Sequence, residues 1–132
     1  MATVSYGYSI QVTGGPQITN TKLATVDAYD RVEVKLDPGA ADVVVDVQPG
    51  ATGQVALLAI SSSLYAPQIT YKVADGSGDK GPYALDAPHF FSGGAVGVFG
   101  VAPKTLKFSN ALPAGAANKA TIDIFVARDA TP

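Results

Sequence analysis

Apolar and polar residues alternate along much of this chain, which is the pattern of a β-strand with one buried face. In one such run, Val32, Val34 and Leu36 alternate with charged residues, so the apolar side chains share a face. The same period of two recurs elsewhere, and we predict a strand in each run. The runs are 4–12, 31–36, 69–73, 105–109 and 121–127.

Three further segments have a less regular pattern. Residues 17–28 are polar and rich in threonine, which indicates a weaker strand or an extended connection. Residues 54–61 contain a short apolar run, which favours a central strand covered on both faces. The run at 43–47 follows an Asp-Pro-Gly turn at 37–39, where proline presets φ and glycine accepts a positive φ. We therefore predict a hairpin between 31–36 and 43–47.

The spacing of strands and turns predicts the fold class. The chain has 132 residues, with 14 glycines and 9 prolines, and no capped run of helical period. Without crossover helices a parallel sheet is disfavoured, and the length fits one domain. We predict a single domain over 1–132 with eight or nine strands. The predicted fold is all-β, an antiparallel β-sandwich with Greek-key or jelly-roll connections, with a closed barrel as second choice.

Charge and hydrophobicity limit the classes of binding partner that the chain is expected to have. Nine basic and 11 acidic residues give a formal net charge of −2, which disfavours nucleic-acid binding. No run reaches the roughly 20 apolar residues that span a membrane, so no membrane span is expected. The first residues, MATVSYGYSIQV, lack the features of a secretory signal. We expect synthesis in the cytoplasm, with incorporation into a particle as an option.

Few residues have the chemistry of a catalytic site. The chain has no cysteine and a single histidine, His89, which excludes thiol nucleophiles and histidine-rich metal sites within one chain. The sequence contains neither the G-x-S-x-G motif of a nucleophile elbow nor a glycine-rich phosphate-binding motif. Asp27 with Asp30, or Asp42 with Asp46, are the remaining acid–base candidates, and each fits a strand end or a solvent-facing position as well. We expect a protein that is not an enzyme and uses no cofactor.

One stretch, DGSGDKGPYALD at 75–86, partly matches a calcium loop. Asp75, Ser77 and Asp79 supply oxygen at positions one, three and five, and Asp86 stands at position twelve. Lys80, however, occupies position six, where the sharp turn of an EF-hand loop requires glycine. An ordinary turn explains the Asp-Gly and Ser-Gly pairs without an ion. We retain these four residues as a candidate calcium site beside the turn interpretation.

The uncharged stretch at 88–103 offers a candidate contact surface. It carries more apolar side chains than a loop normally exposes, so they form core or meet another molecule. Val96 and Val98 fit one more core strand. His89, Phe90 and Phe91 precede it, and we predict that they lie at an interface between subunits, with a packed core position as the alternative.

Three classes of function remain, and we rank them by what each requires. The first is a non-enzymatic structural protein, a self-associating subunit of a virion, phage or other multimeric particle, which needs only a rigid sandwich with apolar contacts. This matches viral β-sandwich subunits in composition and architecture alone. The second is a lectin-like carbohydrate-binding module, with or without calcium, in which Tyr65 and Tyr83 line a shallow site. A hydrolase ranks last.

Overall fold

The computed structural model describes residues 2–47, 55–74, 78–92 and 104–128. This part of the chain contains ten strands and one short 3-10 turn, and no helix in it is long and apolar enough to cross a bilayer. The elements are β1 (Ala2–Gln11), β2 (Gln17–Val26), β3 (Ala28–Leu36), β4 (Val43–Asp46), β5 (Val55–Ser62), β6 (Ile69–Ala74), β7 (Asp79–Ala84), β8 (His89–Ser92), β9 (Thr105–Asn110), the 3-10 turn (Ala116–Asn118) and β10 (Ala120–Arg128).

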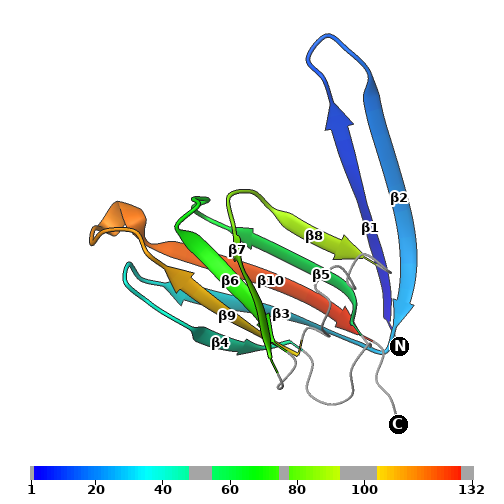
Figure 1. Cartoon of the computed structure of the whole chain (residues 1–132). Coiled ribbons are helices and arrows are strands. Elements are labelled where there is room, and N and C mark those ends of the chain that lie inside the picture. The colour runs from blue at the N-terminus through cyan, green and yellow to red at the C-terminus, as the bar shows by residue number, and fades with distance from the viewer. Residues whose placement is uncertain (1, 48–54, 75–77, 93–103, 129–132) are drawn as a thin grey trace.

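Eight of these strands form two antiparallel sheets that pack face to face (Figure 1). The first sheet has the order β3-β10-β5-β8 and the second the order β4-β9-β6-β7. The chain crosses between the sheets at most connections, and only β6 and β7 follow each other within one sheet. Eight strands in this order make a jelly roll. The predicted all-β sandwich is confirmed, and the described strands close no barrel.

Alternate side chains of both sheets fill the space between them. β6 shows the pattern well, because Ile69, Tyr71 and Val73 are almost completely buried while Thr70 and Lys72 are partly exposed. The same alternation, which the sequence predicts, holds in β9 and β10. The central residues of the core are Leu36, Leu58, Ile60, Ile69, Tyr71, Val73, Leu85, Leu106, Phe108, Ile122, Ile124 and Val126.

β5 is buried on both faces, as its continuous apolar run predicts. It lies between β10 and β8, so both of its edges are paired. Leu58 and Ile60 face the core between the sheets. Leu57 points to the opposite side and is only 3% exposed, because residues from β2 and β10 cover it there.

The predicted hairpin between 31–36 and 43–47 is wrong. β3 pairs with β10 in the first sheet, whereas β4 pairs with β9 in the second. The turn itself forms as expected, with Gly39 at φ 87° and the Ala40 N–H donating to the Asp37 carbonyl over 3.0 Å. The Gly39 N–H then donates to the carbonyl of Asn110 at the end of β9 (2.7 Å), so the turn carries the chain from one sheet to the other.

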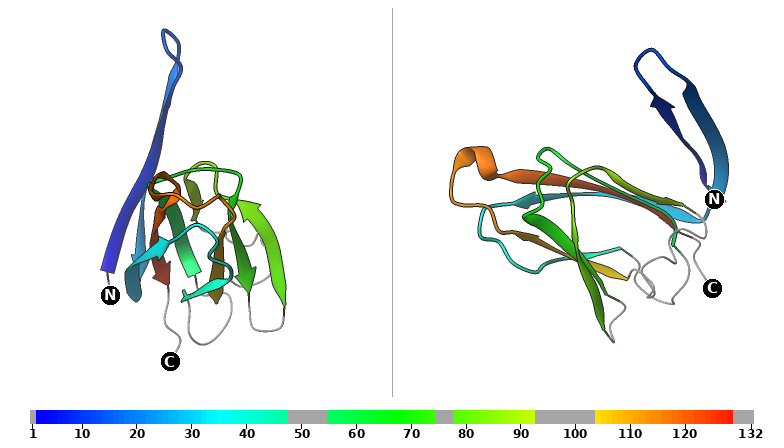
Figure 2. Two further views of the ribbon diagram at one scale, coloured as in Figure 1. Left: turned by 90° about the vertical axis from the view of Figure 1, so that its left-hand side faces the viewer. Right: turned by 45° about the horizontal axis from the view of Figure 1, so that its top comes forward.

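β1 and β2 form a two-stranded hairpin apart from both sheets, here called the arm (residues 2–26). Its strands pair over their whole length, from Ala2 with Val26 to Gln11 with Gln17, so the weak segment at 17–28 contains a full strand. The turn closes with Gly14 at φ 73° and the Val12 N–H donating to the Pro16 carbonyl. Figures 1 and 2 show the arm rising from one end of the sandwich, with its tip away from it.

Two predictions concern the region after β6. The turn-rich segment at 74–87 also contains β7, which pairs with β6 and forms an edge of the second sheet. The core strand expected around Val96 and Val98 lies outside the described residues.

Candidate functional site

The arm has one apolar and one polar face. Residues that are directly opposite in an antiparallel pair share a face of the ribbon. The apolar face carries the pairs Val4–Ala24, Tyr6–Lys22, Tyr8–Asn20 and Ile10–Ile18. The polar face carries the pairs Thr3–Thr25, Ser5–Leu23, Gly7–Thr21, Ser9–Thr19 and Gln11–Gln17. With Leu23 as the exception, the polar face consists of hydroxyl, amide and glycine positions.

The apolar face is covered at its base and exposed toward its tip. At the base, Val26 is buried with Leu57 of β5 and Ala127 of β10, and Val4 and Tyr6 pack against them. Farther out, the side chains are about half exposed. The exposed fractions are 49% for Tyr8, 56% for Ile10, 57% for Val12 and 55% for Ile18. The outer half of the arm therefore presents an apolar strip to solvent.

A groove lies where the arm meets strand β8, and we call it the notch. Its volume is about 390 Å³. Three aromatic rings give it apolar walls, and the ring centroids of Tyr6 and Phe90 are 5.7 Å apart. The lining residues are Tyr6, Gly7, Tyr8, Asn20, Thr21, Lys22, Phe90 and Ser92. The notch thus joins apolar walls to an amide, an amine and several hydroxyls.

The three residues proposed for an interface all lie in β8, an edge strand of the first sheet. Phe90 is 45% exposed and lies in the notch. Phe91 alternates to the other side and packs against the core between the sheets. His89 is partly buried, with its ring edge-on to Phe91. The structure therefore places only Phe90 on the apolar surface beside the arm.

His89 is held by a buried phenol. Its Nδ1 lies 2.7 Å from the hydroxyl of Tyr71, a hydrogen bond whose direction depends on the imidazole tautomer. Burial, with a smaller effect of nearby Tyr83, raises the pKa of Tyr71 well above its ordinary value. The phenol therefore stays protonated at neutral pH and serves as a structural partner for the imidazole.

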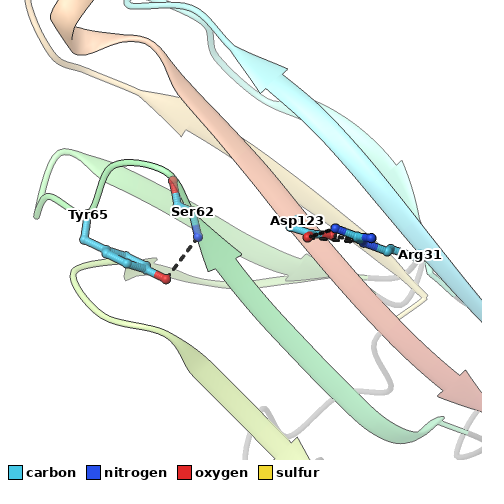
Figure 3. A network of polar contacts seen from close by, with 4 residues as sticks. All are labelled: Arg31, Ser62, Tyr65 and Asp123. Atoms are coloured by element: carbon cyan, nitrogen blue, oxygen red, sulfur yellow. Dashed lines mark hydrogen bonds and ion pairs between the residues drawn. The ribbon is translucent and has the colours of Figure 1, made fainter.

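An exposed ion pair crosses the outer face of the first sheet. Asp123 of β10 accepts from Nε and Nη2 of Arg31 in β3, the shortest distance being 2.7 Å (Figure 3). Hydrogen bonding to the guanidinium lowers the pKa of Asp123, and the same bonds raise the pKa of Arg31. Because the Arg31 side chain is 70% exposed, solvent screens the pair and it stabilises the fold little.

The four calcium-loop residues are only partly described. Asp75 and Ser77 lie outside the described residues. Asp79 begins β7 and pairs with Lys107 Nζ over 2.9 Å, whereas Asp86 follows the other end of β7. A six-residue strand spans roughly 16 Å or more, so the structure does not bring Asp79 and Asp86 together. Within the described part, no three histidine or acidic residues are grouped for a metal ion. The calcium loop stays a prediction.

Tyr65 and Tyr83 are turned toward the protein. Tyr65 packs against the core, and its hydroxyl accepts from the Ser62 N–H over 3.2 Å (Figure 3). Tyr83 packs against Tyr71, with ring centroids 5.6 Å apart. A groove with aromatic walls lies elsewhere, at Tyr6, Tyr8 and Phe90.

The sequence contains a signal for the arm that strand periodicity alone does not reveal. Lys22 is the only charged residue between positions 2 and 26, although 15% of the whole chain is charged. A hairpin half covered by water normally carries more charge on its outer face. A hairpin with a single charge and apolar residues on one face is therefore a candidate contact surface.

No protein-family model, no curated protein and no solved structure matches this chain. Its function is therefore inferred from the geometry and chemistry of the arm and the notch.

Proposed function

We propose that this protein is a non-enzymatic structural subunit that associates with copies of itself, as a component of a virion, phage or other multimeric particle. The observation that carries the proposal is the arm, whose outer half exposes Tyr8, Ile10 and Ile18 on one face and Val12 at the adjoining turn. Such a strip is costly in water, and contact with another protein surface would remove it from solvent.

The composition of the arm supports association. The cores of protein interfaces are depleted of charge and enriched in aromatic residues, and the apolar face has one lysine and two tyrosines. A two-stranded hairpin by itself is only marginally stable in water. A partner packed on the apolar face would therefore also stabilise the arm.

The jelly roll supports the particle setting by analogy only. This architecture occurs in viral capsid domains and also in lectins. Because one fold serves many functions, it leaves both ranked candidates in place.

Association is tested by measuring molecular mass over a range of concentrations with light scattering and mass photometry. We expect a defined multimer. The double variant Ile10→Ser/Ile18→Ser should shift the equilibrium to monomer, because both side chains are more than half exposed in one copy and lie outside the core of the sandwich. The matched control Thr19→Ser/Thr25→Ser changes the polar face and should leave the mass unchanged.

The notch favours carbohydrate binding as the second candidate. Aromatic rings beside Asn20 and Lys22 resemble the mixed apolar and polar surface that a sugar ring requires. A chain that stays monomeric at all concentrations and binds members of a glycan array, with binding lost in Tyr8→Ala, would replace the structural proposal with this one.

A further inference from the structure

We propose that the arms of two copies pack against each other in antiparallel orientation, apolar face to apolar face, with the tip of each arm in the notch of the other copy. This inference rests on the proposed self-association and names the surface that mediates it. The tip is defined by Ile10, Val12 and Ile18.

At the base of the arm, the apolar face is buried by residues of the same chain. There, Val4, Tyr6 and Val26 pack on apolar groups of β5 and β10 within the same chain. The face then continues with the same alternation into Tyr8, Ile10 and Ile18, where no described residue buries it. The uncovered half therefore extends an existing apolar contact, and a second chain would complete it.

Tip and notch match in chemistry. The tip offers aliphatic side chains, and the notch offers the rings of Tyr6, Tyr8 and Phe90 around a volume of about 390 Å³. Aliphatic groups against aromatic walls bury much apolar area, and the polar groups Asn20 and Lys22 at the same groove supply a rim. The single charge of the arm thus lies beside the notch and away from the tip.

The geometry of the arm suits a two-fold contact. Tip and notch lie on the same face but at different heights, since Tyr6 and Ile10 are four residues or about 14 Å apart along β1. In an antiparallel pair, each tip is therefore placed opposite the partner's notch. A contact of this kind is isologous and closes with two copies, so it makes a dimer.

The size of the contact fits a weak, reversible dimer. Only the outer half of the arm is free, a strip about 17 Å long and about 10 Å wide. Two such strips cover roughly 340 Å², and with the notch walls of both copies the contact stays below about 1,000 Å², the range of weak specific interfaces. The dimer should therefore depend on protein concentration.

Cysteine cross-linking tests this arrangement, and the chain suits the method because it has no cysteine. Ile10→Cys places a thiol at the tip, and Ser92→Cys places one in the notch at almost unchanged volume. A disulfide requires Cα atoms within about 7 Å. After the two full-length variants are mixed and oxidised, we expect the Ile10–Ser92 heterodimer to form several-fold more than in the matched control. The control mixes Thr19→Cys, from the polar face near the tip, with the same Ser92→Cys variant.

The outcomes separate this inference from the proposed function. If the unchanged chain associates but the control pair cross-links as well as the tip–notch pair, the arm arrangement is wrong while self-association stands. Preferred cross-linking of Ile10→Cys to itself has the same meaning, since it places tip against tip. A chain that is monomeric at every concentration overturns both proposals.

Discussion

Apart from the phenol of Tyr71, Asn110 is the only polar side chain that is buried in the described part of the chain, with 1% exposure. Its Nδ2 donates to the carbonyls of Leu36 (3.2 Å) and Asn118 (2.9 Å), and its Oδ1 accepts from the Leu112 N–H (3.0 Å). One amide thus satisfies three backbone groups from the end of β3 and the loop before β10. A buried polar group with all its partners fixes a local arrangement that apolar packing leaves free.

We expect Asn110→Ala to lower the free energy of unfolding by roughly 2–4 kcal/mol, because it leaves three backbone groups without their partner. Denaturant unfolding followed by circular dichroism measures the change. Asn118→Ala is the matched control. Its side chain makes one exposed hydrogen bond, to the Pro113 carbonyl, so its loss should cost under about 1 kcal/mol. Equal losses in both variants would contradict the role of Asn110.

Single residues show how far sequence reasoning reaches. The sequence predicts that His89 is a packed or interfacial ring, but it gives no means to find its partner Tyr71, which is 18 residues away and comes close only through the sheets. Asn110 is missed for the same reason, since an asparagine in an alternating run is indistinguishable from a turn residue until its long-range partners are known.

At the scale of the element, β8 separates two neighbouring phenylalanines. Successive side chains of a strand point to opposite faces. Phe90 therefore lies beside the arm, and Phe91 packs on the core. From the sequence, both residues are candidates for one interface, because the stretch at 88–103 has no charged residues that would indicate which face is exposed to solvent.

The two positions predict different phenotypes. Phe91→Ser should lower the free energy of unfolding by about 2–4 kcal/mol, because it opens space against the core. Phe90→Ser should change it by less than about 1 kcal/mol, yet weaken association, since it removes a wall of the notch. Thermal melting measures the change in stability, and mass photometry of the same samples measures the change in association. Strong destabilisation by Phe90→Ser with unchanged association would contradict this division.

The arm and the incorrect hairpin show what alternation leaves undetermined at this scale. Periodicity identifies the strands at 4–12 and 31–36 because the buried face repeats every second residue. It does not identify the neighbour of a strand. Turn chemistry at 37–39 is local and equally suited to a hairpin or a crossing between sheets, and hydrogen bonds to Asn110 decide between them. Alternation also does not show that the strands of the arm pair only with each other and meet the sandwich at their base, through Val26.

For the whole molecule, the sandwich is predictable from the sequence. Strands with one apolar and one polar face form sheets that bury one side, and two such sheets pack together to bury it. The jelly-roll order is selected within that class by long-range pairing, as between β3 and β10. The low content of charged residues is also visible in the sequence, and it is pronounced in the arm, where Lys22 is the only charged residue. The fold class thus follows from local pattern, and the candidate site depends on how distant elements meet.

The low charge of the arm leads to a prediction for assembly in solution. Charged contacts between proteins weaken as salt screens them, but contacts between uncharged apolar faces do not. With Lys22 as its only charge, the arm should give a dissociation constant that changes by less than about threefold between about 50 mM and about 1 M sodium chloride. Sulfate should tighten association, because it strengthens burial of apolar surface.

Sedimentation at several protein concentrations in each salt measures these constants. The Ile10→Ser/Ile18→Ser variant serves as the control, since any association that remains in it arises from other surfaces. If the unchanged chain loses association steeply in sodium chloride, ion pairs hold the copies together. The charged outer face that carries Arg31 and Asp123 would then be the contact surface in place of the arm.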